Sequence, residues 1–401
     1  NNGLVVASIG TYIDNTDLLT CYDYWTPDVS GLVPLGGYSN VDFEPFPGIV
    51  DATYDLKKFW VGSSWQIENG EKLTLNGCAL AMSPGTEIVV KDGGVLEINV
   101  SSSTTPPTPT YIFSCDAMWQ GIIVEPGGEV NVIGNSSLMP AKIQNAIVAI
   151  QGEGNGASSG SPKIFVNLAE FDNNLTAIAL EDDNYSSSMI QQSFFRCSSQ
   201  MMNKAPHLGV YPEYHILLNE ASSVVMGGGP SLNEFEDVFS GIRVNKSSLN
   251  IQKSLFKDLM DNSVSPSVKG IGIVASNTTA TAQTIEVDSR FENLNRGMQV
   301  SGNFNVDVHD NFSTKYFRDI DDVAIFVNSM NYLRDISVVG ISYFRNCNIG
   351  ILLRGNNWNS VNISGNEFDN TNFNETRTGS FHNTAITCQS PITSQPTDFN
   401  I

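Results

Sequence analysis

The sequence predicts an all-β protein whose chain coils into a right-handed parallel β-helix, a solenoid of stacked coils, with an N-terminal cap. A phrase that begins with Phe recurs along the second half of the chain, and a short strand of alternating apolar residues precedes most copies. No segment keeps the apolar period of 3.6 residues that a helical repeat requires. The repeat of about 21–27 residues, lengthened by loops in two units, suits a solenoid better than a propeller, whose blades need about 40–50 residues.

The repeated phrase carries two positions that predict columns running along the solenoid. Its first residues are Phe171, Phe195, Phe235, Phe256, Phe291, Phe317, Phe344 and Phe368. Because like residues of successive coils lie about 4.8 Å apart, these rings predict an internal aromatic stack. Two positions later stand Asn173, Asp237, Asp258, Asn293, Asp319, Asn346 and Asn370. Since Asn and Asp tolerate the left-handed backbone of a sharp turn, this position predicts a polar turn ladder.

The chain before the first Phe unit divides into a solenoid part and a cap. Residues 62–150 read as short strands separated by P-G, D-G-G and P-G-G turns, with residues 101–110 looped out because they are rich in Pro and Thr. Residues 1–61 lack the repeat, and the end strand of a solenoid needs cover for its unpaired backbone. We therefore predict a cap, or the end of a preceding domain, over 1–61, a β-helix over 62–390 and a tail over 391–401.

Composition narrows the class of protein. The formal charge is −21, from 42 acidic and 21 basic residues, which disfavours nucleic acid as a partner. No apolar run approaches the roughly 20 residues of a membrane helix, so no transmembrane segment is predicted. The chain shows neither an initiator Met nor a basic and apolar leader, which indicates a mature or trimmed chain.

The cysteines predict an oxidising compartment. There are six of them, widely spaced: Cys21, Cys78, Cys115, Cys197, Cys347 and Cys388. This number allows 15 pairings and leaves the connectivity open. The bridges we expect, each joining nearby segments, are Cys78–Cys115 and Cys347–Cys388.

The repeats also resemble those of a known class of proteins. The run CDAMWQGIIV at 115–124 follows GCALAMSPGTEIVVKDGGVLEI and precedes the Phe units. Together they resemble the large secreted, cell-surface parallel β-helix proteins of Bacteroidota, which fall in the pectin-lyase-like superfamily and commonly leave the cell by type IX secretion. The resemblance covers roughly residues 62–390 and rests on repeat style. It implies a secreted or cell-surface location and, as partners, other surface or secretion-complex proteins or glycans. No C-terminal sorting domain follows, so we expect it to be cleaved or to lie outside this chain.

The motifs of the enzymes that share this fold are missing. Galacturonases carry N-T-D, D-D, G-H-G and R-I-K on successive coils. Here N-T-D falls at 15–17 in the predicted cap, and D-D at 182–183 and 321–322, while G-H-G, R-I-K and the R-x-P-x-x-R of pectate lyases do not occur. The outward row of the strand after each Phe is predicted as Ala179, Arg243, Gly272, Gln299, Phe326 and Leu352, which offers no paired carboxylates. We assign no catalytic residue and favour a protein that is not an enzyme.

The strand before the Phe of each repeat suggests one further candidate site. With Ile and Val pointing inward there, the residues predicted to point outward are Asn250, Gln252, Glu286, Asp288, Asp307 and His309. Carboxylates on adjacent coils would lie about 5 Å apart, near the spacing of a retaining glycosidase. Glu286, Asp307 and His309 are the catalytic candidates, with His309 as a proton carrier.

The same face has two other interpretations. Glu286, Asp288 and Asp307 could bind Ca²⁺, the one cofactor that the sequence suggests. Alternatively, an acidic chain simply places solvated carboxylates on its exposed strands. If a glycan binds, the aromatic candidates for stacking against sugars are Phe165, Phe326 and Trp358.

These observations favour a non-catalytic extracellular scaffold, a stiff rod that presents loops for adhesion or assembly. Its binding surface is expected in the longest departures from the repeat, around 198–234 and 259–269. The alternative is a β-helix protein that binds or degrades polysaccharide through the face of Glu286 and Asp307. A third reading is a phage tailspike, which shares the fold but usually carries a trimerising C-terminal segment that we do not find.

Overall fold

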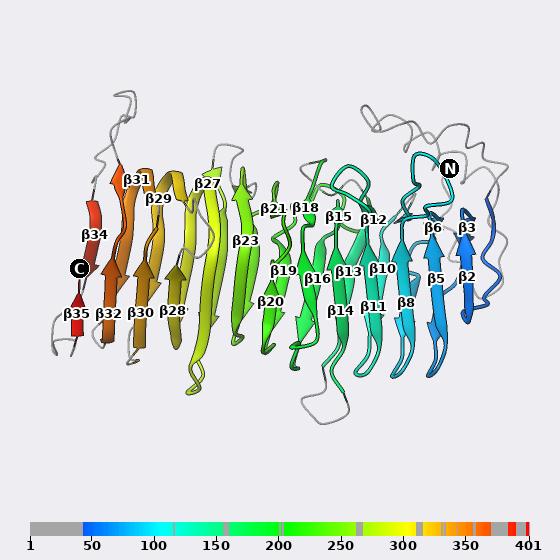
Figure 1. The fold of residues 1–401 in the computed structure, drawn as a ribbon, viewed down its shortest axis with the longest axis horizontal. Coiled ribbons are helices and arrows are strands. Elements are labelled where there is room, and N and C mark those ends of the chain that lie inside the picture. The colour runs from blue at the N-terminus through cyan, green and yellow to red at the C-terminus, as the bar shows by residue number, and fades with distance from the viewer. Residues whose placement is uncertain are drawn as a thin grey trace.

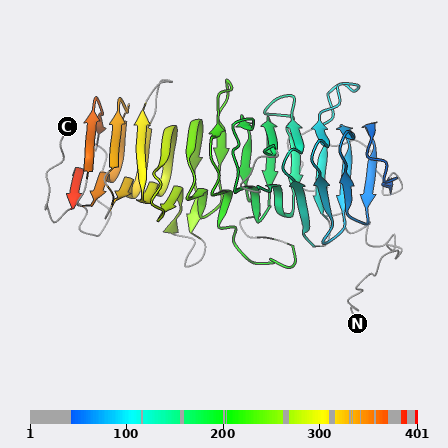
Figure 2. The same cartoon turned by 90° about the horizontal axis from the view of Figure 1, so that it is seen from below.

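The computed structural model describes residues 43–114, 117–154, 160–199, 202, 204–261, 268–309, 316–329, 332, 334–341, 343–355, 358–369, 384–389 and 398–400. Every regular element in this part of the chain is a β-strand, and all but two strands join one sheet that winds along a rod (Figures 1 and 2). Each strand pairs in parallel with the equivalent strand of the next coil. The structure is therefore a parallel β-solenoid, as predicted.

Each coil contributes a strand to three faces. The first face holds β2 (Ala52–Asp55), β5 (Lys72–Asn76), β8 (Val95–Asn99), β11 (Glu129–Ile133), β14 (Lys163–Asn167), β17 (Met189–Gln191), β20 (Val224–Met226), β28 (Phe304–His309), β30 (Arg334–Val339), β32 (Trp358–Ser364) and β35 (Asp398–Asn400). The second face holds β1 (Glu44–Pro45), β3 (Lys58–Val61), β6 (Ala79–Met82), β9 (Tyr111–Ser114), β12 (Ala141–Gln144), β15 (Ala169–Asp172), β18 (Phe194–Arg196), β21 (Asn233–Phe235) and β33 (Phe368–Asp369).

The third face holds β4 (Trp65–Ile67), β7 (Glu87–Val90), β10 (Trp119–Val124), β13 (Ala146–Gly152), β16 (Thr176–Glu181), β19 (Tyr214–Asn219), β22 (Ser240–Asn245), β26 (Ile271–Asn277) and β34 (Thr384–Gln389). Four long strands bend from one face to the next: β23 (Leu249–Lys257), β27 (Gln283–Gly302), β29 (Tyr316–Asn328) and β31 (Tyr343–Arg354). A separate antiparallel pair, β24 (Met260–Asp261) and β25 (Val268–Lys269), lies in the excursion predicted at 259–269.

Parallel pairing extends beyond the predicted domain boundaries. β2 and β3, within the range predicted as the cap, already pair with β5 and β6. β35, within the predicted tail, pairs with β32. Residues 1–42 lie outside the described residues. The predicted looped-out segment 101–110 joins β8 to β9 and is closed by an antiparallel bridge between Ser101 and Thr108.

The predicted aromatic stack is confirmed on the second face. The eight phenylalanines from Phe171 to Phe368 stack in succession, with ring centroids 4.6–5.2 Å apart and planes within 2–10° of parallel. This spacing equals the distance between hydrogen-bonded strands, so the coils and the rings share one repeat. The stack belongs to a single apolar core that runs the length of the rod.

The predicted turn position is also confirmed where it is described. Asn173, Asp237, Asp258, Asn293, Asp319 and Asn346 all have φ between 51 and 57°. Asn370 lies outside the described residues. The exception is Cys197, which replaces the polar residue on its coil and is fully buried.

The glycine of the repeated phrase is required by the aromatic stack. A Cβ on Gly241, Gly272 or Gly297 would come within 2.5–2.6 Å of the ring of Phe256, Phe291 or Phe317. The prediction that Gly272 belongs to the outward row of the third face was therefore wrong. Val274 takes that place, paired with Arg243 and Gln299 on the neighbouring coils.

Candidate functional site

The first face brings most of the predicted site residues into one line. Phe165 pairs with Met189, which lies beside Val225 on the next coil, and Val225 pairs with Asn250. Asn250 pairs with Glu286, and Glu286 pairs with Asp307. We call this line of outward side chains the first-face row. Its continuity follows from the register alone, because side chains at equivalent positions of parallel strands lie one coil apart.

Two residues of this row, Glu286 and Asp307, form a polar cluster with His309, which lies two residues beyond Asp307 on β28. The imidazole of His309 lies between two carboxylates, with Nε2 3.6 Å from Glu286 Oε1 and Nδ1 3.5 Å from Asp307 Oδ1. Asn250 donates a hydrogen bond of 2.7 Å to Glu286 Oε2, and Gln252 donates one to Asn250. The hydrogen bond from Asn250 orients Glu286, and the imidazole of His309 lies beside it.

Asp288 departs from the prediction. It was expected to point outward beside Glu286, but it is 1% exposed, in the long strand β27 that continues from the first face onto the second. A buried Asp288 does not complete an outward set of oxygens with Glu286 and Asp307. Among the residues that the structure describes, no group of three or more His, Cys, Asp or Glu side chains is arranged to hold a metal ion.

The aromatic candidates differ in what they offer a ligand. Phe326 is 9% exposed, with the guanidinium groups of Arg296 and Arg354 5.4 and 5.6 Å from its ring centroid. Trp358 packs against the core of the rod. Phe326 is therefore covered by its neighbours, contrary to the prediction, whereas Trp358 is half-buried and its role in sugar stacking stays a prediction. Phe165 remains half-exposed in the first-face row.

The predicted disulfides are not formed. Cys78 and Cys347 are free, buried thiols, as is Cys197. Cys78 Sγ instead contacts the carbonyl oxygen of Tyr54, and burial raises the pKa of its thiol to about 11. Cys388 pairs with Leu353 rather than with the segment around Cys347, so the backbone register separates the expected partners. Cys115 lies outside the described residues.

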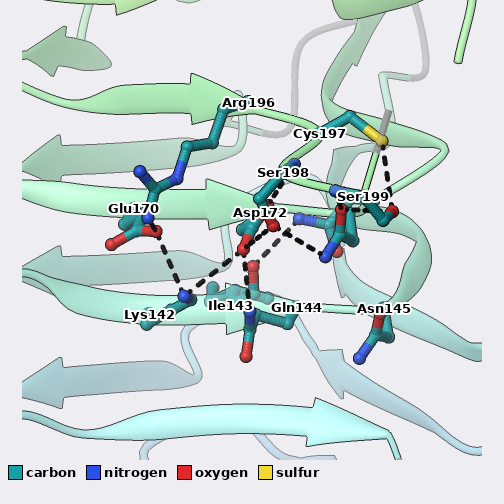
Figure 3. A network of polar contacts seen from close by, with 12 residues as sticks. Lys142, Ile143, Gln144, Asn145, Glu170, Asp172, Arg196, Cys197, Ser198 and Ser199 are labelled. Carbon is teal, nitrogen blue, oxygen red and sulfur yellow. Dashed lines mark hydrogen bonds and ion pairs between the residues drawn. The ribbon is translucent and has the colours of Figure 1, made fainter. Parts of the chain in front are cut away.

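A buried polar network on the second face was missed by the sequence analysis (Figure 3). Asp172 accepts hydrogen bonds from the backbone and hydroxyl of Ser198 and from Gln144, all of 3.0 Å. Lys142 Nζ lies 3.1 Å from Glu170 and 3.4 Å from Asp172, and Arg196 pairs with Glu170. Burial alone would raise the pKa of Asp172, but Lys142, Ser198 and Arg196 together hold it below its usual value.

This network opens a longer series of charges, the charge ladder, formed by the residue after each stacked Phe. In chain order its members are Asp172, Arg196, Glu236, Lys257, Glu292, Arg318, Arg345 and Asp369. Lys257 pairs with Glu236 at 2.6 Å and with Glu234 at 3.1 Å, and Arg318 pairs with Glu292. From Asp172 to Arg318 the sign of the charge alternates from coil to coil, and this pattern, visible in the sequence once the register is known, is the signal that could have revealed the ladder.

Comparison with known proteins adds no relative: no family model matches the chain, and neither a curated protein nor a solved structure matches it. No helix of the described residues is long and apolar enough to cross a membrane. The fold thus defines the class of protein, a parallel β-solenoid. The first-face row and the charge ladder are the surface features from which we infer a function.

Proposed function

We propose that the protein is a non-catalytic extracellular scaffold, a stiff right-handed β-helix rod that presents loops at a cell surface for adhesion or assembly. The charge ladder is the observation that carries this proposal. Its carboxylates and cations pair with residues of neighbouring coils, and Asp172 is enclosed by donors from its own rod. Charges paired in this way hold neighbouring coils together, which supports a structural role for this face.

The location is part of the same proposal. The repeat style resembles secreted surface β-helix proteins of Bacteroidota, and the acidic composition suits a secreted protein. In the predicted loop region, residues 204–213 supply a surface that the other described coils do not share.

A second candidate function is binding or degradation of a polysaccharide along the first-face row. The observation that favours it is the alignment of Phe165, Asn250, Glu286 and Asp307 in one row, with His309 between the two carboxylates. A sugar polymer lying along the rod would meet an apolar stretch and then hydrogen-bonding groups, which is the mixture that glycan sites use.

One experiment separates the two functions. The wild-type chain and a Glu286→Gln/Asp307→Asn variant are screened for glycan binding and for polysaccharide degradation. The control is Asp335→Asn, which removes an exposed carboxylate of the same face outside the row. Binding or degradation that the double variant loses and the control keeps would establish the second function. Wild-type protein without activity on any substrate supports the scaffold.

A further inference from the structure

Most of the exposed large apolar side chains of the described residues lie on one stretch of the rod, and five of them form two groups there. These exposed side chains are Ile49, Leu56, Ile133, Leu138, Met189, Leu208, Val210 and Val225. Ile133, Met189 and Val225, which are 38–42% exposed, lie on the first face, on coils that begin with β11, β17 and β20. Leu208 and Val210 lie together in the loop between β18 and β19 on the same stretch of the rod. Grouped apolar exposure of this kind marks an interaction surface.

The first group forms a continuous patch, defined as Ile133, Phe165, Met189 and Val225. Phe165, Met189 and Val225 follow one another in the first-face row, and Ile133 lies on the preceding coil within reach of Phe165. The other outward residues of these coils are three amides, Asn131, Asn167 and Gln191, and one pair of opposite charges. The nearest ionic side chains, Lys163 and Glu129, pair with each other at 3.7 Å. The patch is therefore uncharged on a chain of net charge −21.

The second group is a knob, Leu208 and Val210, in the connection between β18 and β19. Residues 204–213 contact an earlier coil of the rod, where Met118 N–H donates to the carbonyl of Ala205 over 2.7 Å. Met202 packs with Met118 and Cys197 beneath the loop, and its backbone bonds to Gly209 and Val210, both at 2.8 Å. The tip is thus fixed before any partner arrives, with Leu208 69% and Val210 43% exposed. Between Ala205 and Val210 it carries no carboxylate, ammonium or guanidinium group.

The knob and the patch lie on opposite sides of the rod at the same level. The loop connects β18 on the second face to β19 on the third face, so it lies at the corner between these two faces. In a rod with three faces, this corner lies opposite the first face. When two surfaces that bind each other lie on opposite sides of one molecule, each copy can bind a further copy. Such heterologous contacts form an open array instead of a closed dimer. Neither surface carries a carboxylate, so copies with a large negative charge can meet there with least repulsion.

We propose that copies of this chain associate side by side, the Leu208/Val210 knob of one rod contacting the Ile133/Phe165/Met189/Val225 patch of the next, to form a lateral array. This inference rests on the scaffold function proposed above and names a second copy as the partner. Each contact is small compared with the ~1,200–2,000 Å² of a stable interface, so association is weak in solution and gains strength by repetition.

The test is sedimentation equilibrium of the 401-residue chain over a range of concentrations. The wild type is expected to gain mass with concentration without a plateau at the dimer. A knob variant, Leu208→Asp/Val210→Asp, and a patch variant, Met189→Asp/Val225→Asp, should each remain monomeric. An equimolar mixture of the two should stop at the dimer, because it retains one intact knob and one intact patch. Ile49→Asp, an exposed control outside both surfaces, should behave as wild type.

Several results would overturn the proposal: a monomeric wild type, a closed wild-type dimer, a variant that associates like wild type, or a mixture that stays monomeric. Far-ultraviolet spectra and thermal midpoints check that each variant is folded, and Leu208→Ser serves as a milder change. Added salt should strengthen the association, because it screens the repulsion between the negatively charged copies. An association held by ionic contacts would instead become weaker as salt is added. A monomeric wild type would leave the scaffold function open, since that function is judged by the separate glycan screen.

Discussion

The side-chain amide of Asn293 donates a hydrogen bond of 2.5 Å to the carboxylate of Asp258 on the preceding coil. Asn346 donates to Asp319 in the same way, over 2.8 Å. The turn ladder is thus stabilised where an amide follows a carboxylate. At Asp237 the next residue of the column is a second carboxylate, Asp258, because Phe235 pairs with Phe256. Burial, followed by the charges of Glu236 and Asp258, raises the pKa of Asp237 to about 6.

Replacing this carboxylate by an amide should stabilise the rod. A raised pKa in the folded state means that the wild type loses stability as the pH rises from about 4 to about 6. We expect Asp237→Asn to gain about 1 kcal/mol at pH 7.5, discounted for partial exposure, and nothing below pH 4. Urea unfolding at the two pH values measures this. Asp319→Asn, whose carboxylate already accepts from Asn346, should show no gain; an equal gain would contradict the explanation.

His215 predicts a pH dependence of opposite sign. Its ring is buried, with Nε2 2.6 Å from the carbonyl oxygen of Glu236, and burial lowers its pKa to about 4. The unfolded chain therefore binds the proton more tightly, and stability should fall as the pH drops from about 6.5 to 4, by up to about 3 kcal/mol. His215→Gln keeps a donor for the carbonyl and removes the titration. Parallel pH profiles of unfolding free energy for variant and wild type would refute this assignment.

The aromatic stack should dominate the stability of the second face. Phe291 is fully buried between Phe256 and Phe317, with centroids 4.9 and 4.7 Å away. Phe291→Ala should cost about 3–5 kcal/mol, as large core truncations do. The matched control is Phe326→Ala, an outward ring that loses only its contacts with arginine and nearby side chains, at about 1 kcal/mol. Similar urea midpoints for the two variants would show that the stack is not what holds the coils together.

Replacing Lys257 tests how much the ion pairs of the charge ladder contribute to stability. Its ammonium group contacts Glu234 and Glu236, so Lys257→Met leaves two carboxylates on adjacent positions of one face. Because the pair is partly exposed, we expect a loss of about 1 kcal/mol at low salt. The loss should shrink in 1 M NaCl, where the screening length is about 3 Å. Lys246→Met, which removes one exposed pair with Glu220, should cost little at either salt concentration. A loss that does not depend on salt would point to packing by the Lys257 stem instead.

Much of the fold was readable because a solenoid repeats its local rules. Each Phe must match the ring below it, and each turn must place Asn or Asp in left-handed backbone, so one unit predicted the others. The same repetition misled at Gly272, where two glycines fit the pattern and only contact with the Phe291 ring decided which one packs inward. The disulfides failed for a related reason, since proximity in sequence says nothing of the face on which a cysteine lies.

The sequence by itself determined the β-solenoid, its aromatic stack and the outward orientation of Glu286, Asp307 and His309, because alternation and column identity follow from strand geometry. Only the tertiary structure decided which coil lies beside which and in what register. That register joined Phe165, Asn250, Glu286 and Asp307 into one row and buried Asp288 and Phe326. The same register set charges of alternating sign against one another from Asp172 to Arg318. It also placed the Leu208/Val210 knob opposite an apolar patch. Loop lengths differ from coil to coil, so contacts across the coils arise only when the chain is wound.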